Sequence, residues 1–149
     1  MITKFLNEET IRLKLHAKNR DEAIELAAEP LIELGRITPE YVTEIKDALI
    51  ELGPYIVIIP GIALAHAKPG EYVQEECMSF ATFTEPVVFG HSINDPVRAV
   101  FVLASPYKDK HLDSLHSVSK LLNKPEFQKL LFESGDLREM LDYIKQEDS

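Results

Sequence analysis

The N-terminal part of the chain changes from a strand period to a helix period. Residues 11–15 alternate apolar and charged side chains, which is typical of a half-buried strand. The apolar positions that follow recur every three or four residues, with Asp21 as the expected helix cap and Gly35 as the expected end. Pro30 lies inside this helical pattern and is expected to kink or split the helix.

A second helix is predicted from signals at both of its ends. Thr38 is a capping residue type, Pro39 suits the first helical position, and Gly53-Pro54 is expected to end the helix. Its expected apolar face consists of Tyr41, Val42, Ile45, Ala48 and Leu49.

The middle of the chain is predicted to form strands. The expected strands are residues 55–59, 62–64, 77–83 and 97–104. Residues 55–59 and 100–103 are almost continuously apolar, which indicates strands covered on both faces of a sheet.

Helices are predicted again after residue 104. The longest is expected over residues 109–122 with Asp109 as its cap, and two shorter ones are expected from Pro125 and from Asp136. Its expected inward residues are Leu112, Leu115, Val118 and Leu122. The whole pattern predicts one layered α/β domain over residues 1–149, a sheet with helices on both faces, and leaves the strand order open.

Composition and charge exclude several classes of protein. A net charge of −9 argues against nucleic acid as a partner, because phosphate backbones are bound chiefly by clustered lysine and arginine. No stretch approaches the roughly 20 apolar residues of a membrane-spanning helix, and no secretory signal is seen, so a cytoplasmic protein is expected. The single cysteine, Cys77, excludes an internal disulfide and is expected to be a buried, inert thiol.

Two of the five histidines lie where chemistry is plausible. His66 ends a short apolar strand among small residues, where another protein could approach its ring; the alternative is a core or turn histidine. His111 lies in the first turn of a helix, where a neutral ring could donate a hydrogen bond to a phosphoryl group; the alternative is an exposed histidine.

The other histidines have simpler interpretations. His116 is expected at the core or its edge, His16 on the surface, and His91 in a solvated loop. In that loop, Asn94 and Asp95 are expected to hydrogen-bond nearby backbone. A metal site of His66, His91 and His111 is left open, whereas the phosphate-loop, dinucleotide, nucleophile-elbow and zinc-protease motifs are absent from the sequence.

Several of these segments resemble one known family. Residues 53–67, which include Gly-Pro-Tyr and Pro-Gly-Ile-Ala-Leu-Ala-His-Ala, resemble the phosphoacceptor region of mannitol/fructose-type EIIA domains (EIIA type 2) of the phosphoenolpyruvate-dependent sugar phosphotransferase system. Residues 86–91 and 94–97 are most similar to the ascorbate-specific branch. The resemblance extends over almost the whole chain.

The resemblance implies a phosphotransferase component with a mixed sheet flanked by helices. His66 would be the phosphoacceptor nucleophile and His111 the donor that stabilises the phosphoryl group, with no metal or cofactor. Phosphoryl would arrive from the phosphocarrier protein HPr and leave to a cysteine of an EIIB component, which serves a membrane EIIC transporter for L-ascorbate. The alternatives are an EIIA for fructose, mannitol or galactitol, and a regulatory EIIA-like protein that controls a transcription factor or transporter.

The chain departs from the family at two places. Ala65 stands where the family usually has proline, which frees a backbone torsion and restores an N–H donor before His66. Residues 47–51 lack the arginine that many mannitol-type and fructose-type members carry in this helix. Other groups must therefore stabilise the negative charge of the phosphoryl group.

Overall fold

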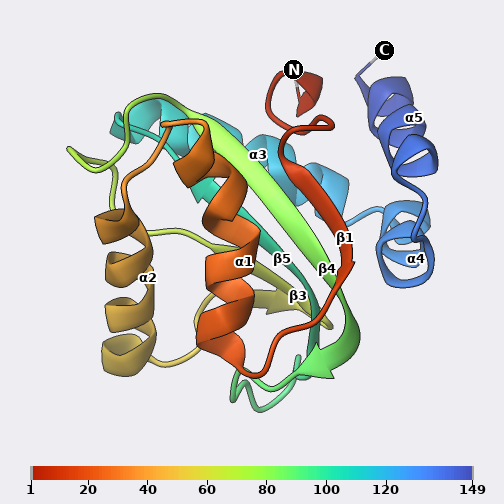
Figure 1. Ribbon diagram of the computed structural model, residues 1–149, viewed down its shortest axis with the longest axis horizontal. Coiled ribbons are helices and arrows are strands. Elements are labelled where there is room, and N and C mark those ends of the chain that lie inside the picture. The colour runs from red at the N-terminus through yellow and green to blue at the C-terminus, as the bar shows by residue number, and fades with distance from the viewer. Residues whose placement is uncertain (1, 149) are drawn as a thin grey trace.

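The computed structural model describes residues 2–148 as a mixed five-stranded sheet between two helical layers (Figure 1). In chain order, the elements are η1 (Ile2–Lys4), β1 (Ile11–Leu15), α1 (Arg20–Glu33), α2 (Pro39–Leu52), β2 (Val57–Ile59), β3 (Ile62–Ala65), β4 (Cys77–Val87), β5 (Val97–Ala104), α3 (Lys108–Leu122), α4 (Pro125–Glu133) and α5 (Leu137–Glu147). The fold class predicted from the sequence is confirmed. No helix in this part of the chain is long and apolar enough to cross a membrane.

The strand order β1-β4-β5-β3-β2 brings two chain segments to one end of the sheet. β3 and β5 are parallel neighbours, with Ala65 opposite Val102, whereas β4 pairs antiparallel with β5 and parallel with β1. The segment after β3 and the segment after β5 therefore leave the sheet side by side. His66 is the first residue after β3, and α3, which carries His111, is the first helix after β5.

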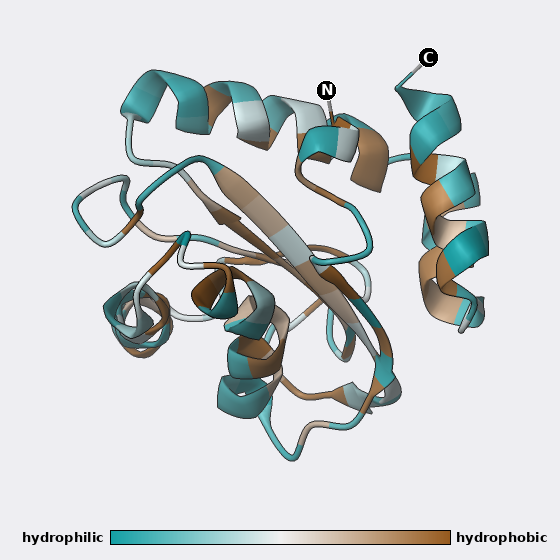
Figure 2. Ribbon diagram, turned by 45° about the horizontal axis from the view of Figure 1, so that its top comes forward, coloured by the Kyte–Doolittle hydropathy of each residue, from teal (hydrophilic) through white to brown (hydrophobic). Residues whose placement is uncertain are grey.

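Each face of the sheet has its own hydrophobic core. Residues of α1 and α2 pack on one face, and residues of α3, α4 and α5 pack on the other. Figure 1 shows α1 and α2 in front of the sheet with α3 behind it, and Figure 2 shows hydrophobic residues along the strands between these layers. A stacked pair, Phe80 and Phe101, lies in the second core with ring centroids 4.5 Å apart.

A glycine makes the tight turn from β2 into β3 possible. Gly61 has φ 82°, a left-handed conformation that side chains disfavour, and a Cβ built there would lie 3.0 Å from the ring of Phe132. Its N–H donates to the carbonyl of Asn94 at 3.0 Å. The start of the strand that carries His66 is thereby fixed to the loop before β5.

Two predicted helix caps are wrong, and the split that was one of the two outcomes predicted for Pro30 does not occur. Asn19, not Asp21, caps α1, because its side chain accepts from the N–H of Glu22 at 2.9 Å. Pro30 lies within α1 without splitting it into two helices. Tyr107, not Asp109, is the capping residue of α3.

Three burial predictions also fail. Leu112 is 56% exposed and His116 is exposed, because the inward face of α3 is made by other positions. These are His111, Ser114, Val118, Leu121 and Leu122. Ile58 of β2 is 38% exposed, because β2 is an edge strand and not a strand covered on both sides.

Other predicted details are confirmed. The second helix begins after Thr38 with Pro39 and ends at Gly53, and the side chain of Asp136 caps α5. Cys77 is fully buried at the start of β4, where burial raises the pKa of its thiol to about 12.

The two ends of the described chain are hydrogen-bonded to each other. The carboxylate of Asp148 accepts from the backbone N–H of Ile2 at 2.9 Å and from that of Thr3 at 2.7 Å. η1 and α5 therefore lie side by side near β1 (Figure 1).

Candidate functional site

His66 is held in one tautomer by the strand that precedes it. Its ring Nδ1 lies 2.8 Å from the carbonyl oxygen of Leu64. A carbonyl oxygen only accepts hydrogen bonds, so Nδ1 carries the ring proton. The lone pair of the neutral ring is then on Nε2, the nitrogen available as a nucleophile.

His111 lies next to His66, as the parallel pairing of β3 and β5 requires. The two ring centroids are 5.7 Å apart with an angle of 47° between the ring planes. His111 is 7% exposed, and its Nδ1 is buried without a hydrogen-bond partner in residues 2–148. Its Nε2 is thus the nitrogen left to reach a group placed between the two rings.

Both imidazoles are shifted towards their neutral forms. Burial lowers the pKa of His66 below the ordinary 6.5, and the hydrogen bond to Leu64 opposes part of this shift. Burial also lowers the pKa of His111, with a further lowering from His66 and an opposing effect of Glu76. Two neutral rings at neutral pH supply a nucleophile and a donor, which is what transfer of an anionic group requires.

The histidine pair lies in an open cleft of about 730 Å³ between α2 and the segment after β3. The lining residues are Glu44, Asp47, Ala48, Glu51, Leu52, Tyr55, His66, Ala67, Lys68, Pro69 and His111. A neighbouring hollow of about 670 Å³ shares Lys68, Pro69 and His111 and extends to Tyr107 and Leu112. A macromolecule could therefore reach the histidines from outside.

The side of the cleft that is formed by α2 is acidic, and we call it the acidic wall. Glu44, Asp47 and Glu51 follow a spacing of three and then four residues, so they lie along one face of the helix. None of the three carboxylates has a side-chain partner within the described residues. Lys68 is the one lysine or arginine that lines the cleft.

Two tyrosines contact the backbone beside His66. The hydroxyl of Tyr55 donates to the carbonyl oxygen of His66 at 2.9 Å, and its ring lies edge-on to the imidazole. The hydroxyl of Tyr41 accepts from the N–H of Ala67 at 3.0 Å. Sequence reasoning missed both roles, because Tyr41 fits an ordinary apolar helix face and a hydroxyl's distant partner leaves no local signal.

The remaining histidines lie elsewhere. His16 is exposed, as predicted. His91 lies in the loop before β5, at the opposite end of the sheet from His66, where its Nδ1 accepts from the N–H groups of Ile93 and Asn94. The metal site of His66, His91 and His111 is therefore wrong, and residues 2–148 contain no group of three His, Cys, Asp or Glu side chains that could hold a metal ion.

Asp95 makes the expected hydrogen bonds within the loop of His91, whereas the side chain of Asn94 bonds a residue 37 positions away in the sequence. The carboxylate of Asp95 accepts from the N–H groups of Phe89 and Gly90, and the amide of Asn94 donates to the carbonyl of Val57. These contacts give the loop a structural role.

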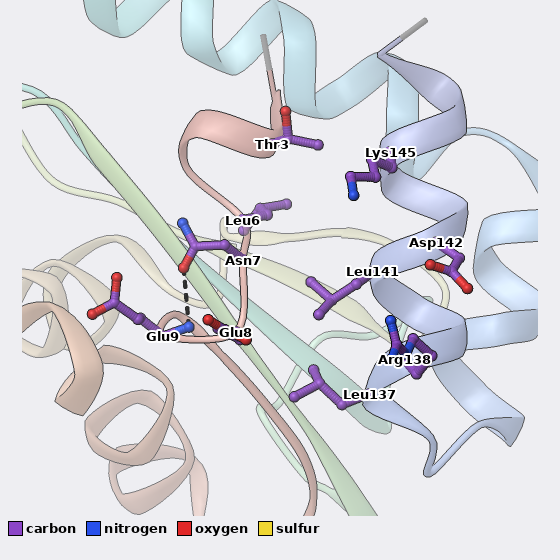
Figure 3. Close-up of a pocket in the computed structure, with 10 residues that line it drawn as sticks. All are labelled: Thr3, Leu6, Asn7, Glu8, Glu9, Leu137, Arg138, Leu141, Asp142 and Lys145. Carbon is purple, nitrogen blue, oxygen red and sulfur yellow. Dashed lines mark hydrogen bonds between the residues drawn. The ribbon is translucent and has the colours of Figure 1, made fainter.

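Another hollow, of about 580 Å³, lies between the N-terminal segment and α5 (Figure 3). Figure 3 shows Leu137 and Leu141 of α5 pointing towards the N-terminal segment, with charged side chains around them. No histidine or cysteine lines this hollow, and it lies beside β1, at the sheet edge opposite to β2. It is therefore separate from the histidine pair.

The chain matches one known family over almost its whole length. Residues 4–147 match the family described as "Phosphoenolpyruvate-dependent sugar phosphotransferase system, EIIA 2". The chain belongs to this EIIA family. The ascorbate-specific EIIA component of Escherichia coli (strain K12) is 33% identical over 102 residues, which are 68% of this chain and 66% of that protein. The match thus spans just under two thirds of the relative's length.

Solved EIIA structures have the same fold. The mannitol-specific cryptic enzyme IIA CmtB of Escherichia coli is similar with a TM-score of 0.88 and 26% identity, over 97% of this chain and 98% of that one. Enzyme IIA for mannitol from Escherichia coli, in its complex with phosphorylated enzyme IIB, has a TM-score of 0.81 and 25% identity, over 94% and 96%. The family predicted from the sequence is confirmed.

Proposed function

We propose that this EIIA protein is a phosphohistidine carrier that accepts phosphoryl from phospho-HPr on Nε2 of His66 and passes it to a cysteine of an EIIB component. The observation that carries the proposal is the neutral His66 ring, with Nδ1 hydrogen-bonded to the carbonyl of Leu64, next to His111 in an open cleft. In the first step the donor's N–P bond breaks as the bond from Nε2 to phosphorus forms. In the second step an EIIB thiolate takes the phosphoryl group, and His66 returns to its neutral form.

The chemistry depends on position and charge. Phosphoryl transfer has a loose transition state, so holding Nε2 in line with the donor and stabilising the equatorial oxygens supply most of the rate. The hydrogen bond from Nδ1 to Leu64 aims Nε2 and stabilises the positive charge that develops on the ring. His111 supplies an N–H donor to the phosphoryl oxygens.

The acidic wall of the cleft indicates what the partner must bring. A phosphoryl dianion on His66 would lie in a cleft with three unpaired carboxylates, and Lys68 alone would offset them. HPr and EIIB would therefore each present basic side chains to Glu44, Asp47 and Glu51 when they dock. The exposed apolar residues Leu52 and Leu112, at the cleft and the neighbouring hollow, would supply apolar contact area.

The test of the carrier role is labelling through a purified relay. Radiolabelled phosphoenolpyruvate, the first enzyme of the system, HPr and this protein are combined, and acid-labile label on the chain is measured. His66→Ala should remain unlabelled with an unchanged circular dichroism spectrum. His116→Ala, an exposed histidine on α3, is the matched control and should label like the wild type. Undiminished labelling of His66→Ala would overturn the proposal.

The transport role is proposed for L-ascorbate, in the cytoplasm, with the EIIC transporter served indirectly through EIIB. The similarity to the ascorbate-specific EIIA of Escherichia coli supports this choice over fructose, mannitol and galactitol. The labelled protein is offered to EIIB components of each specificity, and the ascorbate type should accept phosphoryl fastest. Transfer to another EIIB would reassign the sugar, and transfer to none would favour a regulatory protein.

A further inference from the structure

We infer that Tyr41 and Tyr55 are positioning residues that clamp a single peptide plane, the one between His66 and Ala67, and thereby keep Nε2 of His66 aimed into the cleft. The inference deepens the proposed function and rests on it for the consequence in phosphoryl transfer. Its geometric part concerns the tautomer of His66 and is independent of any phosphoryl donor.

The two hydroxyls bind opposite sides of the same peptide group. Tyr55 donates to the carbonyl oxygen of His66 at 2.9 Å, and Tyr41 accepts from the N–H of Ala67 at 3.0 Å. Since this carbonyl and this N–H belong to one planar amide, the plane cannot rotate without breaking one of the two hydrogen bonds. The torsions on either side of the plane, ψ of His66 and φ of Ala67, are therefore fixed together.

Tyr41 also ties this peptide to the core of the sheet. Its side chain is fully buried, and its hydroxyl donates to the carbonyl oxygen of Leu103 in β5 at 2.7 Å. A tyrosine hydroxyl has one proton to donate, and the carbonyl of Leu103 takes it while the oxygen accepts from Ala67. Through Tyr41, α2, β5 and the segment after β3 are held in one arrangement.

Tyr55 completes the clamp from the solvent side. It is 38% exposed, and its ring centroid lies 5.7 Å from that of His66 with the planes at 82°. This edge-on contact limits rotation of the imidazole while the hydroxyl holds the carbonyl. Ring and backbone of the acceptor are thus restrained by one residue.

The clamp supplies a restraint that residue 65 does not. Proline at that position would fix the φ angle one residue before the acceptor, whereas Ala65 leaves it to be set by strand pairing with Val102. The hydrogen bond from Nδ1 of His66 to the carbonyl oxygen of Leu64 spans Ala65. Loosening the plane after His66 should therefore release Nδ1 and redistribute the ring proton.

The variants Tyr41→Phe and Tyr55→Phe remove the hydroxyls and keep the rings. Tyr72→Phe is the matched control, because the Tyr72 hydroxyl makes no hydrogen bond to the described residues. Nitrogen NMR of the imidazole should show the wild type and the control protonated at Nδ1 in the neutral form. Both test variants should show a larger share of ring protonated at Nε2.

The same variants are compared in transfer from phospho-HPr. We expect kcat to fall about 3- to 10-fold in each variant, because one neutral hydrogen bond is lost. KM should stay within about twofold of the wild type, because the docking surface is unchanged. Tyr41→Phe leaves the buried carbonyl of Leu103 and the N–H of Ala67 without the hydroxyl that they bind, so this variant could fail to fold. Tyr55→Phe keeps the experiment decisive in that case. Its readouts do not depend on the buried hydroxyl.

The outcomes separate the clamp from the carrier role. An unchanged tautomer in the folded variants overturns the clamp whatever the rate does, and a shifted tautomer with unchanged kcat overturns its part in transfer. A wild-type protein that never becomes labelled overturns the proposed function instead, and the NMR comparison still decides whether the hydroxyls hold the ring.

Discussion

Replacing His111 by alanine should slow phosphoryl transfer to His66 roughly 10- to 100-fold while the label stays on His66. The ring centroids are 5.7 Å apart, so the two imidazoles leave room for a phosphoryl oxygen between them. A hydrogen bond to a charged partner contributes about 1.5–3 kcal/mol, and each 1.36 kcal/mol corresponds to about tenfold in rate. The expected loss follows from these two quantities.

The assay is rapid-quench transfer from radiolabelled phospho-HPr, with the site of the label mapped by mass spectrometry. His111→Gln keeps a donor of similar reach and should recover part of the loss. Because His111 is buried, thermal unfolding of each variant is measured to separate a packing defect from the missing donor. His116→Ala, on the same helix but exposed, should transfer at the wild-type rate. Label on His111 in the wild type, or an unchanged rate in His111→Ala, would refute the reasoning.

Three further predictions concern pH, the acidic wall and the thiol. Because burial lowers the pKa of His66, labelling followed from about pH 8 to about pH 5 should decline only below the ordinary value of 6.5, and an earlier decline contradicts this. The imidazole of His66 binds fewer protons in the folded protein than in the unfolded chain. Its contribution to the free energy of unfolding is therefore present above pH 6.5 and is lost as pH falls through the pKa of the folded state. Asp47→Asn with Glu51→Gln should raise KM for phospho-HPr about two- to fivefold per charge and flatten its salt dependence; an unchanged salt dependence excludes charge steering. Cys77→Ser should leave transfer unchanged but lower the unfolding free energy by about 1–3 kcal/mol in urea titration, and loss of transfer in a folded variant contradicts an inert thiol.

The sequence predicts those parts of the fold that depend on local pattern. Residues 11–15 and 97–104 form the expected strands, and Thr38-Pro39 and Gly53 bound α2, because alternation, capping and glycine act within a few residues. Val118 and Leu122 of α3 are buried as predicted, but Leu112 and His116 are not, because the apolar positions of this helix allow more than one stripe. Packing against the sheet selects the stripe through Val118 and Leu122, which belong to the same core as residues of α4 and α5.

The candidate site is predictable only in part for the same reason. The position of His66 at a strand end is a local signal, but its closeness to His111 depends on β3 lying beside β5, which no local pattern gives. The hydroxyl of Tyr41 finds Leu103 across 62 positions of sequence. Such long-range pairings are set by packing of the whole sheet.

The hydrogen bonds of Asp148 to Ile2 and Thr3 have a consequence for chain connectivity. Since Ile2 and Asp148 are in contact, a short linker could join the two ends, and the resulting circular chain could be opened between the exposed residues Ser92 and Ile93 in the loop before β5. That loop lies at the opposite end of the sheet from His66. A circular permutant of this kind keeps every strand neighbour of the histidine pair, so the order in which the elements are synthesised is separable from the arrangement that brings His66 and His111 together.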